Sequence, residues 1–539
     1  MRFYSKHFKR DFNQWSLFTV AISLFIAIPV FTIIFHLFNG KGEMWDHIVT
    51  YFLLDYVLNS ITLLFGTGII CFSIGTASAW IVTKYDFPYR KLIEWLLFMP
   101  LAIPSYIVAY SYVGLLGNGG TFIRFLNMLG IPIKKIEMMN IYGLIAVLSF
   151  SLFPYVYAGT RAMFKSYPNS IRESAYLLGA SEIRYFFSVA LPLASPAIIG
   201  GLFLVFMEVL NDYGAAKYYG INTFTTGIFR TWTALEDIQS SIYLSALLVV
   251  LVLFLLAMVK WFRGKKSYAL KFNNEDKTQR YNLVGYKKIY LIFVFIPILA
   301  GFVFPVIQLL IWAVQTFEVI FNYALFSLVI QSVFVALFTA LIIVLTALLL
   351  IYFSRWSILK TPRFFPKIAT LGYVIPGAII GIGIIRSSTS IIVFFDTYLN
   401  LKVGYLFYGS SVVLIYAYIF RFLAVGYNSI EANTLKLGKH LEQTSYLLGI
   451  DKFVTFVKID LPLLRNSIIS AFVLVFIDTL KELPLTLILK PYDLNTLAVK
   501  AYEYAEDERV AEASIPALLL ILTIAILITL INYKKSKTN

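Results

Sequence analysis

The chain has 539 residues, of which 59% are hydrophobic, 17% aromatic and only 14% charged. Because soluble domains typically carry about 25% charged residues, this composition excludes a soluble enzyme, a disordered chain and a nucleic-acid-binding domain. The formal net charge of +16 is therefore interpreted first as a signal of membrane topology. The single cysteine, Cys71, excludes intrachain disulfides and a thiolate metal cluster, and the four histidines are scattered, so no firm metal site is predicted.

Twelve long apolar runs follow one another along the chain. A bilayer core about 30 Å thick requires roughly 20 apolar residues in a helix, and the runs lack the alternation of barrel strands. The sequence therefore predicts an all-α, polytopic membrane protein. The predicted spans are residues 15–38, 59–82, 93–116, 141–162, 194–212, 241–261, 288–313, 326–353, 367–390, 405–428, 464–482 and 514–532.

The positively charged residues in the loops predict the orientation of these spans. With the N-terminus in the cytoplasm, 32 of the 45 Lys and Arg residues fall on cytoplasmic segments and 11 on outer segments, while Arg386 and Arg421 lie inside spans. This asymmetry follows the positive-inside rule. We therefore expect a multi-pass protein of the bacterial cytoplasmic (inner) membrane with both termini in the cytoplasm.

An internal repeat divides the chain into two six-helix halves. Residues 176–179 and 446–449 both read YLLG, and Phe186 and Phe456 match at the same offset of 270 residues, as do several later positions. A polar, basic segment separates the halves. We predict a first half at 1–262, a cytoplasmic linker at 263–287 and a second half at 288–539, with a pseudo-two-fold axis along the membrane normal. Pro104 and Pro376 interrupt the third span of each half.

Each half has a long cytoplasmic loop between its fourth and fifth spans, at 165–193 and 427–463. Each loop holds a short amphipathic helix that ends at a glycine, Gly179 or Gly449, which supplies a left-handed cap. We expect the proline that follows, Pro192 or Pro462, to open the next span. Two such helix–glycine–helix elbows on one face indicate docking of two copies of a partner. The alternative is a pair of solvated connectors with good caps.

The sequence ESAYLLG at 173–179, followed by Pro192, resembles the EAA loop of binding-protein-dependent ABC importer permeases. In that family the loop is a coupling helix that sits in a cleft of the ATPase subunit. The second copy departs from the pattern, since Gln443 aligns with Glu173 and Glu442 lies one residue earlier. The resemblance implies one coupling loop at Glu173, Ser174, Ala175, Gly179, Ala180 and Pro192, and another at Glu442, Gln443, Ser445, Gly449, Ile450 and Pro462.

The resemblance is finer to the fused, two-half ferric-iron permeases of this family. It is carried by EVLNDYGAAKYYG at 208–220, KELPLTLIL at 481–489 and AYEYAEDER at 501–509. It implies a permease for ferric iron, although related permeases move thiamine, phosphonates, polyamines or sulfate. The alternative class is a twelve-helix secondary transporter driven by an ion gradient, for which the elbow loops are too long and too patterned. A structural membrane scaffold would not explain the duplicated elbows.

Ionisable residues near the ends of the fifth and eleventh spans are candidates for a transport path. Glu208 and Asp212, and Asp478 and Glu482, are spaced i and i+4, so that each pair shares a helix face, and the pairs match at the 270-residue offset. Carboxylate oxygens suit a hard cation such as Fe³⁺, and Tyr213, Tyr218 and Tyr219 add phenol oxygens nearby. The alternative is structural ion pairing with Lys481 or Arg386.

The chain has no nucleotide-binding motif, so it is expected to bind no cofactor and to catalyse no reaction. The resemblance implies that two ABC ATPase subunits use ATP for it and that an extracytoplasmic binding protein delivers the substrate. Membrane lipid is a further partner, and nucleic acid is not. The acidic segment 502–512 is predicted to be an outer ledge for the binding protein, with a merely solvated loop as the alternative.

Overall fold

The computed structural model describes residues 14–263, 280–283, 285–357, 364–407, 409–435, 437 and 440–538. Ten of the described helices are long and apolar enough to cross a bilayer. A bent pair, Arg90–Ala102 with Ser105–Met128, and a shorter apolar helix, Ser514–Thr529, add two further segments. These segments correspond to the twelve expected runs and confirm an all-α polytopic fold.

The chain folds into two compact units. The first-repeat unit comprises residues 43–321 and 501–539, and the second-repeat unit comprises residues 1–42 and 322–500. These boundaries cut across the two predicted halves because the first helix of each half belongs to the unit built mainly from the other half. The division into halves at 1–262 and 288–539 stays a prediction about the repeat, and most of the linker, 264–279 and 284, lies outside the described residues.

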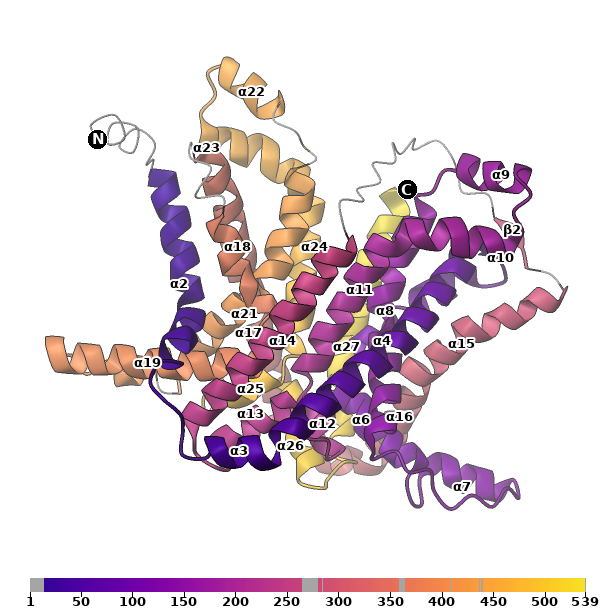
Figure 1. The fold of residues 1–539 in the computed structure, drawn as a ribbon, viewed down its shortest axis with the longest axis horizontal. Coiled ribbons are helices and arrows are strands. Elements are labelled where there is room, and N and C mark those ends of the chain that lie inside the picture. Colours follow the sequence, from indigo (N-terminus) through magenta and orange to yellow (C-terminus); the bar gives the residue numbers. More distant parts are fainter. Residues whose placement is uncertain are drawn as a thin grey trace. The chain divides into compact units, whose positions relative to one another are not determined.

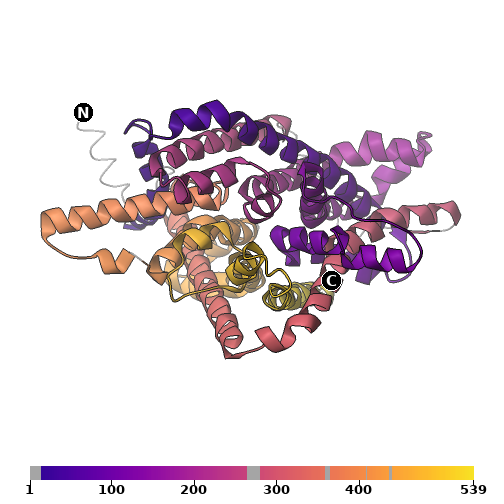
Figure 2. The same cartoon turned by 90° about the horizontal axis from the view of Figure 1, so that it is seen from below.

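The first-repeat unit has its centre at α4, α8 and α11, which pack on one another. The linker reaches this unit as strand β2, which pairs with β1 in parallel. From the second half, α15 packs on α4, and α16 packs on α6 and on the C-terminal helix α27 (Figure 2). The elements of this unit are α3 (Trp45–Tyr51), α4 (Leu53–Lys84), β1 (Tyr85–Asp86), α5 (Arg90–Leu96), η1 (Met99–Ala102), α6 (Ser105–Leu116), α7 (Thr121–Met128), α8 (Ile141–Lys165), α9 (Asn169–Leu177), α10 (Glu182–Tyr185), η2 (Phe186–Ala190), α11 (Leu191–Asn211), α12 (Gly214–Tyr218), α13 (Phe224–Thr233), α14 (Ile238–Arg263), β2 (Tyr281–Asn282), η3 (Gly285–Leu291), α15 (Ile292–Ile298), η4 (Leu299–Val303), α16 (Phe304–Ile320) and α27 (Ser514–Thr538).

The second-repeat unit repeats this arrangement with α17, α21 and α24 at its centre. The N-terminal helix α2 packs on α17 and α19, and the Ser16 and Ser357 hydroxyls lie 2.7 Å apart. Helix α26 (Leu497–Glu506) continues from this unit into the other. The elements here are α2 (Gln14–His36), α17 (Tyr323–Trp356), α18 (Phe365–Ala369), η6 (Thr370–Tyr373), α19 (Gly377–Leu399), α20 (Gly404–Phe407), α21 (Ser411–Thr434), α22 (His440–Leu447), α23 (Lys452–Thr455), η7 (Phe456–Asp460), α24 (Leu461–Leu480) and α25 (Pro484–Leu489).

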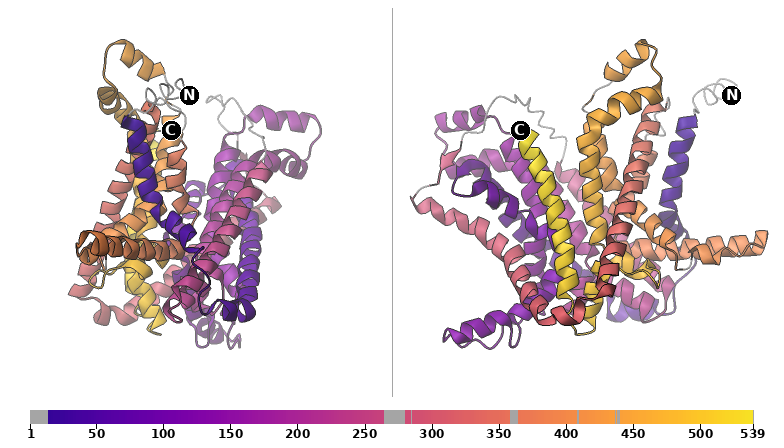
Figure 3. Two further views of the ribbon diagram at one scale, coloured as in Figure 1. Left: turned by 60° about the vertical axis from the view of Figure 1, so that its left-hand side comes forward. Right: turned by 180° about the vertical axis from the view of Figure 1, so that it is seen from behind.

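The third span is broken in both repeats, as the prolines predict. Pro104 precedes α6 and Pro376 precedes α19, and each has extended backbone torsions that stop the preceding helix. In the second repeat the long helix therefore begins at Gly377 and reaches Leu399, so the expected run at 367–390 is shifted. Figures 1 and 3 show α19 lying across the neighbouring helices of its unit rather than along them.

Helix α19 packs closely on α2 because of its glycines. A Cβ atom added at Gly383 would lie 2.9 Å from the Pro29 carbonyl oxygen and 2.9 Å from the Ile33 side chain. Because one of these neighbours is the Pro29 backbone carbonyl, movement of the Ile33 side chain alone cannot relieve the contact. The glycine at position 383 thus permits close packing of the two helices.

We predict that Gly383→Ala lowers the stability of the detergent-purified protein by about 1–3 kcal/mol, because the added methyl group overpacks the α2–α19 contact. The measurement is the thermal unfolding midpoint. Ser390→Ala is the control, since Ser390 is an exposed residue of the same helix. Equal midpoints for the two variants would contradict the predicted contact.

Candidate functional site

Helix α9 of the first-repeat unit ends in a glycine-capped turn. Gly179 has a φ of +79°, a left-handed conformation that residues with a Cβ rarely adopt. The Gly179 amide donates to the Tyr176 carbonyl at 2.9 Å, and the Ala180 amide donates to the Ala175 carbonyl at 3.0 Å. This pair of bonds is the Schellman motif, which satisfies the last carbonyls of the helix and reverses the chain.

The second-repeat unit contains the same turn. Gly449 has a φ of +75°, and the Ile450 amide donates to the Ser445 carbonyl at 3.1 Å. Beyond the glycine, the order of exposed, half-buried and buried residues is identical over 181–190 and 451–460. Each glycine is followed by a four-residue helix, a π-turn and a long helix, all in register at the 270-residue offset. The repeat found in the sequence is therefore a repeat of structure.

The expectation that a proline opens the fifth span was wrong. The helix is continuous from Glu182 to Asn211 in one repeat and from Lys452 to Leu480 in the other, and Pro192 and Pro462 lie inside it. A proline ring clashes with the carbonyl four residues earlier in an α-helix, and a widened π-turn immediately precedes each proline. The proline is thus accommodated by the π-turn instead of beginning a new helix.

An aromatic contact attaches each elbow to the second span of its repeat, α4 or α17. The Phe186 ring in η2 lies 4.9 Å from the Trp80 ring near the end of α4. In the other unit, the Phe456 ring in η7 lies 4.2 Å from the Tyr352 ring near the end of α17. The two phenylalanines are equivalent in the repeat. Each elbow is therefore held to the core of its own unit at the same position.

The first elbow has an additional polar attachment. Lys84 at the end of α4 lies 2.9 Å from the Glu182 carboxylate and donates to the Tyr176 hydroxyl at 3.3 Å. The Tyr85 hydroxyl also donates to Glu182. Glu182 is therefore bound by the last residue of α4 and the first residue of β1.

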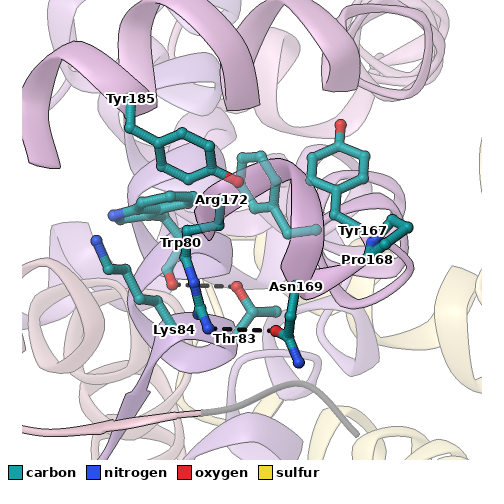
Figure 4. A pocket seen from close by; sticks show the side chains of 9 residues that line it. Trp80, Thr83, Lys84, Tyr167, Pro168, Asn169, Arg172 and Tyr185 are labelled. Carbon is teal, nitrogen blue, oxygen red and sulfur yellow. Dashed lines mark hydrogen bonds between the residues drawn. The ribbon is translucent and has the colours of Figure 1, made fainter. Parts of the chain in front are cut away.

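A small cavity of about 40 Å³ lies beneath this elbow. Figure 4 shows Trp80, Lys84, Arg172 and Tyr185 around it, with Arg172 donating to Asn169 at 3.2 Å. The cavity is lined by the ends of α4 and α8 and by residues of α9 and α10. It marks the place where the elbow meets the ends of two membrane helices.

The linker contributes to the first elbow, which the sequence did not predict. The Arg172 guanidinium of α9 lies 4.9 Å from the centre of the Tyr281 ring in β2. The Leu283 amide donates to the Asp86 carbonyl at 3.1 Å and extends the β1–β2 pairing. The sequence of the linker did not predict a strand, because a strand of two residues is too short to show the alternation of polar and apolar residues that is typical of strands.

The tips of both elbows expose large apolar side chains. Leu177 and Leu178 are 88% exposed, and the equivalent Leu447 and Leu448 are 88% and 73% exposed. If these loops lie in the cytoplasm, as the loop charges predict, lipid does not account for this exposure. Matched apolar tips indicate two equivalent surfaces for a protein partner.

Two carboxylates of the first-repeat unit lie at the end of the helix that begins in the elbow. Asp212 accepts a hydrogen bond from the Ser105 hydroxyl, at the start of α6, and from the Ala216 amide of α12 at 3.0 Å. The Tyr155 hydroxyl donates to Glu208 at 3.5 Å. Asp212 therefore joins the end of α11 to the broken third span.

Glu482 has the corresponding position in the second-repeat unit. It accepts from the Leu485 amide at 3.1 Å and from Arg421 Nε at 3.0 Å, and Arg421 also donates to the Ile375 carbonyl at 3.1 Å. Both side chains of this ion pair are buried. Glu482 thereby joins the end of α24 to the break before α19.

Comparison with known proteins agrees with this geometry. Residues 69–265 match the family described as "Binding-protein-dependent transport system inner membrane component". The chain is 25% identical over 475 residues to the Fe(3+)-transport system permease protein FbpB 2 of Haemophilus influenzae, covering 87% of each chain. The chain is therefore similar to inner-membrane permeases of binding-protein-dependent transport systems, and in one case the similarity covers 87% of its length.

Similarity to sulfate transport permeases is more local. The permease is 29% identical to the sulfate transport system permease protein CysT of Salmonella typhimurium over 148 residues, which is 28% of this chain and 52% of that protein. It is 24% identical to a probable sulfate transport permease of Prototheca wickerhamii over 34% of this chain. The family description and these relatives indicate a multi-pass inner-membrane subunit of a binding-protein-dependent transport system.

The predicted coupling residues differ in exposure, and the structure describes the side chains of only some of them. Glu173 and Ser174 are exposed on α9, whereas Ser445 is buried, and its hydroxyl lies 2.7 Å from that of Thr455. The side chains of Glu442 and Gln443 lie outside the part of the chain that the structure describes. The coupling role of both loops in the permease stays a prediction.

The four predicted path carboxylates are divided between the two units. Lys481 pairs with Asp478 at 3.1 Å, as the salt-bridge alternative anticipated, but Glu482 pairs with Arg421 instead of Arg386. The sequence showed Arg421 only as a charge inside a span, and its partner lies 61 residues away. The role of these carboxylates in a transport path stays a prediction.

We predict that Glu482→Gln destabilises the purified permease by about 3–5 kcal/mol, because it leaves the Arg421 charge buried without its partner. The thermal unfolding midpoint gives the measurement. The double variant Glu482→Gln with Arg421→Met should recover most of the loss. Asp478→Asn should have a much smaller effect, because the Asp478–Lys481 pair is only half-buried. An equal loss of stability in Glu482→Gln and Asp478→Asn would contradict the importance of the buried Arg421–Glu482 pair.

Proposed function

We propose that this permease imports ferric iron delivered by an extracytoplasmic binding protein. The observation that carries the proposal is the similarity to an Fe(3+)-transport permease over 87% of both chains. The carboxylates at the outer ends of α11 and α24 and the tyrosines after Asp212 support it, because ferric iron is a hard cation that prefers oxygen ligands. Thiamine, phosphonate, polyamine and sulfate remain alternatives within the same class.

Sulfate is the alternative with an observation in its favour, since two sulfate permeases of separate organisms match part of the chain. An anion such as sulfate would be expected to contact positively charged side chains or neutral hydrogen-bond donors at the outer surface. The acidic pairs and the acidic segment 502–512 favour a cation instead. A secondary transporter is disfavoured because the family works with an ATPase and because the elbows have no role in transport driven by an ion gradient.

The elbows would couple the permease to two ATPase subunits, one on each exposed pair of leucines. The chain itself would bind no cofactor, and the partner subunits would use the ATP. With both termini in the cytoplasm, the elbows face the ATPase subunits. Closure of the ATPase subunits on ATP would push both elbows and open the path outward, and hydrolysis would restore the inward-open state. In this proposal each elbow acts as a lever, which means that its displacement moves the membrane helix attached to it. The Phe186–Trp80 and Phe456–Tyr352 contacts support this role, because they bind each elbow to a membrane helix.

For the substrate, we predict that ferric-loaded binding protein raises ATP turnover several-fold in liposomes that contain the permease and its ATPase. The binding protein should be supplied with ferric iron, sulfate or no substrate in parallel, and turnover measured as phosphate release. Stimulation by sulfate but not by ferric iron would overturn the proposed substrate. Uptake that needs a proton or sodium gradient and no nucleotide would overturn the importer mechanism.

For the docking surface, we predict that Leu178→Ser combined with Leu448→Ser releases the ATPase from the permease. Burial of a leucine side chain contributes about 1.5–3 kcal/mol, so each ATPase subunit, which loses one such contact, should bind its elbow about ten- to a hundredfold more weakly. The measurement is the amount of ATPase that co-purifies with the permease. Leu129→Ser is the matched control, because Leu129 is an exposed leucine in an outer loop. Undiminished co-purification of the double variant would contradict docking at the elbow tips.

A further inference from the structure

A cavity of about 390 Å³ lies in the first-repeat unit on the side that the loop charges place outside the cytoplasm. This volume is within the range of small-ligand pockets. The cavity is formed by α12, by α26 with the turn after it, and by Met139. The polar residues that line it are Lys217, Tyr218, Tyr502, Glu506 and Glu508.

Two tyrosines of the cavity belong to a larger group of aromatic rings. The Tyr502 ring lies 6.1 Å from Tyr106 and 5.9 Å from Tyr213, and the Tyr218 ring lies 6.2 Å from Tyr110. Tyr502 is buried, whereas Glu506 and Glu508 are exposed at the rim. The cavity therefore has phenol groups in its wall and carboxylates at its entrance.

The repeat shows that the fold does not require these phenols. Helix α25 is the equivalent of α12, and there Leu483, Ile488 and Leu489 replace Tyr213, Tyr218 and Tyr219. Aliphatic side chains thus fill the same positions in a helix of the same architecture. Tyr213 stacks on Phe229 at 3.8 Å and the Tyr219 hydroxyl donates to the Ala109 carbonyl at 3.2 Å, so both have partners within the fold, whereas Tyr218 lines the cavity.

The charge and the donor atoms of the residues that line the cavity favour a cation as its ligand. Two carboxylates face one ammonium group, Lys217, so the cavity carries a net negative charge at neutral pH. Carboxylate and phenol oxygens are hard donors, which suit a hard, highly charged cation. An oxyanion such as sulfate would be repelled by both carboxylates, with only one lysine to offset them.

We propose that this cavity is a receiving site for the ferric cation, in which Tyr218 and Tyr502 supply phenolate oxygens and Glu506 and Glu508 supply carboxylate oxygens. The site rests on the proposed function of ferric iron import and names the residues that take the metal from the binding protein. The described residues contain no group of three His, Cys, Asp or Glu side chains able to hold a metal. The proposed site differs in combining two carboxylates with two phenols. The site would hold the cation on its way, with water filling the remaining coordination positions.

Binding at this site must release protons. A phenol has an ordinary pKa of about 10, so both tyrosines are neutral at physiological pH before the metal arrives. Each phenol that binds ferric iron gives its proton to water as the oxygen–iron bond forms, and no electron is transferred. Affinity should therefore fall as the pH is lowered, because protons compete with the metal for the phenolate oxygens.

The test measures binding of ferric nitrilotriacetate to the detergent-purified permease without its ATPase or binding protein. Wild type should bind the metal and develop the visible absorption of a phenolate–iron(III) charge transfer. Tyr218→Phe with Tyr502→Phe should abolish this absorption and weaken binding roughly tenfold or more. Glu506→Gln with Glu508→Gln should weaken binding while keeping the absorption. Because the latter residues are exposed, this variant remains informative if the tyrosine variant folds poorly.

Matched controls are available on the same helix and turn. Tyr504→Phe and Asp507→Asn remove a phenol and a carboxylate that do not line the cavity, and both should bind ferric iron as wild type does. Absence of binding and of visible absorption in wild type would overturn the site. Equal loss in the control variants would also overturn it, because binding would then be a general property of the acidic segment.

Failure of the site and failure of the proposed function give different results. If ferric-loaded binding protein stimulates ATP turnover equally in wild type and in the Tyr218→Phe, Tyr502→Phe variant, iron import stands and the receiving site is wrong. If it does not stimulate wild type at all, the proposed substrate itself is wrong.

Discussion

The structure depends on the continuity of one helix in each repeat. The segment Glu182–Asn211 has 30 residues, so it extends about 45 Å, and the segment Lys452–Leu480 has 29. Each begins at the elbow and ends beside a carboxylate at the opposite end. The π-turn before Pro192 or Pro462 preserves this continuity, because it removes the clash that would otherwise break the helix. A displacement of the elbow is therefore a displacement of the whole span.

The two ends of this helix are fixed to different elements. At the elbow end, Phe186 contacts the Trp80 ring of the second span. At the far end, Asp212 accepts a hydrogen bond from Ser105, where the third span is broken. Phe456 and Glu482 make the corresponding contacts in the other unit. Broken helices whose free backbone groups are satisfied by side chains are tolerated within membranes, and such breaks are natural places for motion. The carboxylates thus have a structural task whether or not they also contact the substrate.

The sequence predicted the features that rest on composition and repetition. The apolar runs predicted the spans, Gly179 and Gly449 predicted the caps, and Pro104 and Pro376 predicted the broken third spans. It failed where the structure depends on contacts between distant residues, as between Arg421 and Glu482, or on a local compensation, as in the π-turn before Pro192. The β1–β2 pairing was also missed, because a strand of two residues is too short to show an alternating sequence pattern. The charge inside a span singled out Arg421 but did not identify its partner, Glu482.

The most direct test of the lever breaks the continuity of the helix without changing either end. Three glycines inserted between Ala190 and Leu191, and three between Asp460 and Leu461, should leave the ATPase bound and active but abolish transport, because the elbows would no longer move the spans. The measurement is ferric iron transported per ATP hydrolysed in liposomes, with the same insertion in the linker as a control. The account predicts a ratio near zero for the helix insertions and a normal ratio for the linker insertion. A normal ratio in both would contradict it.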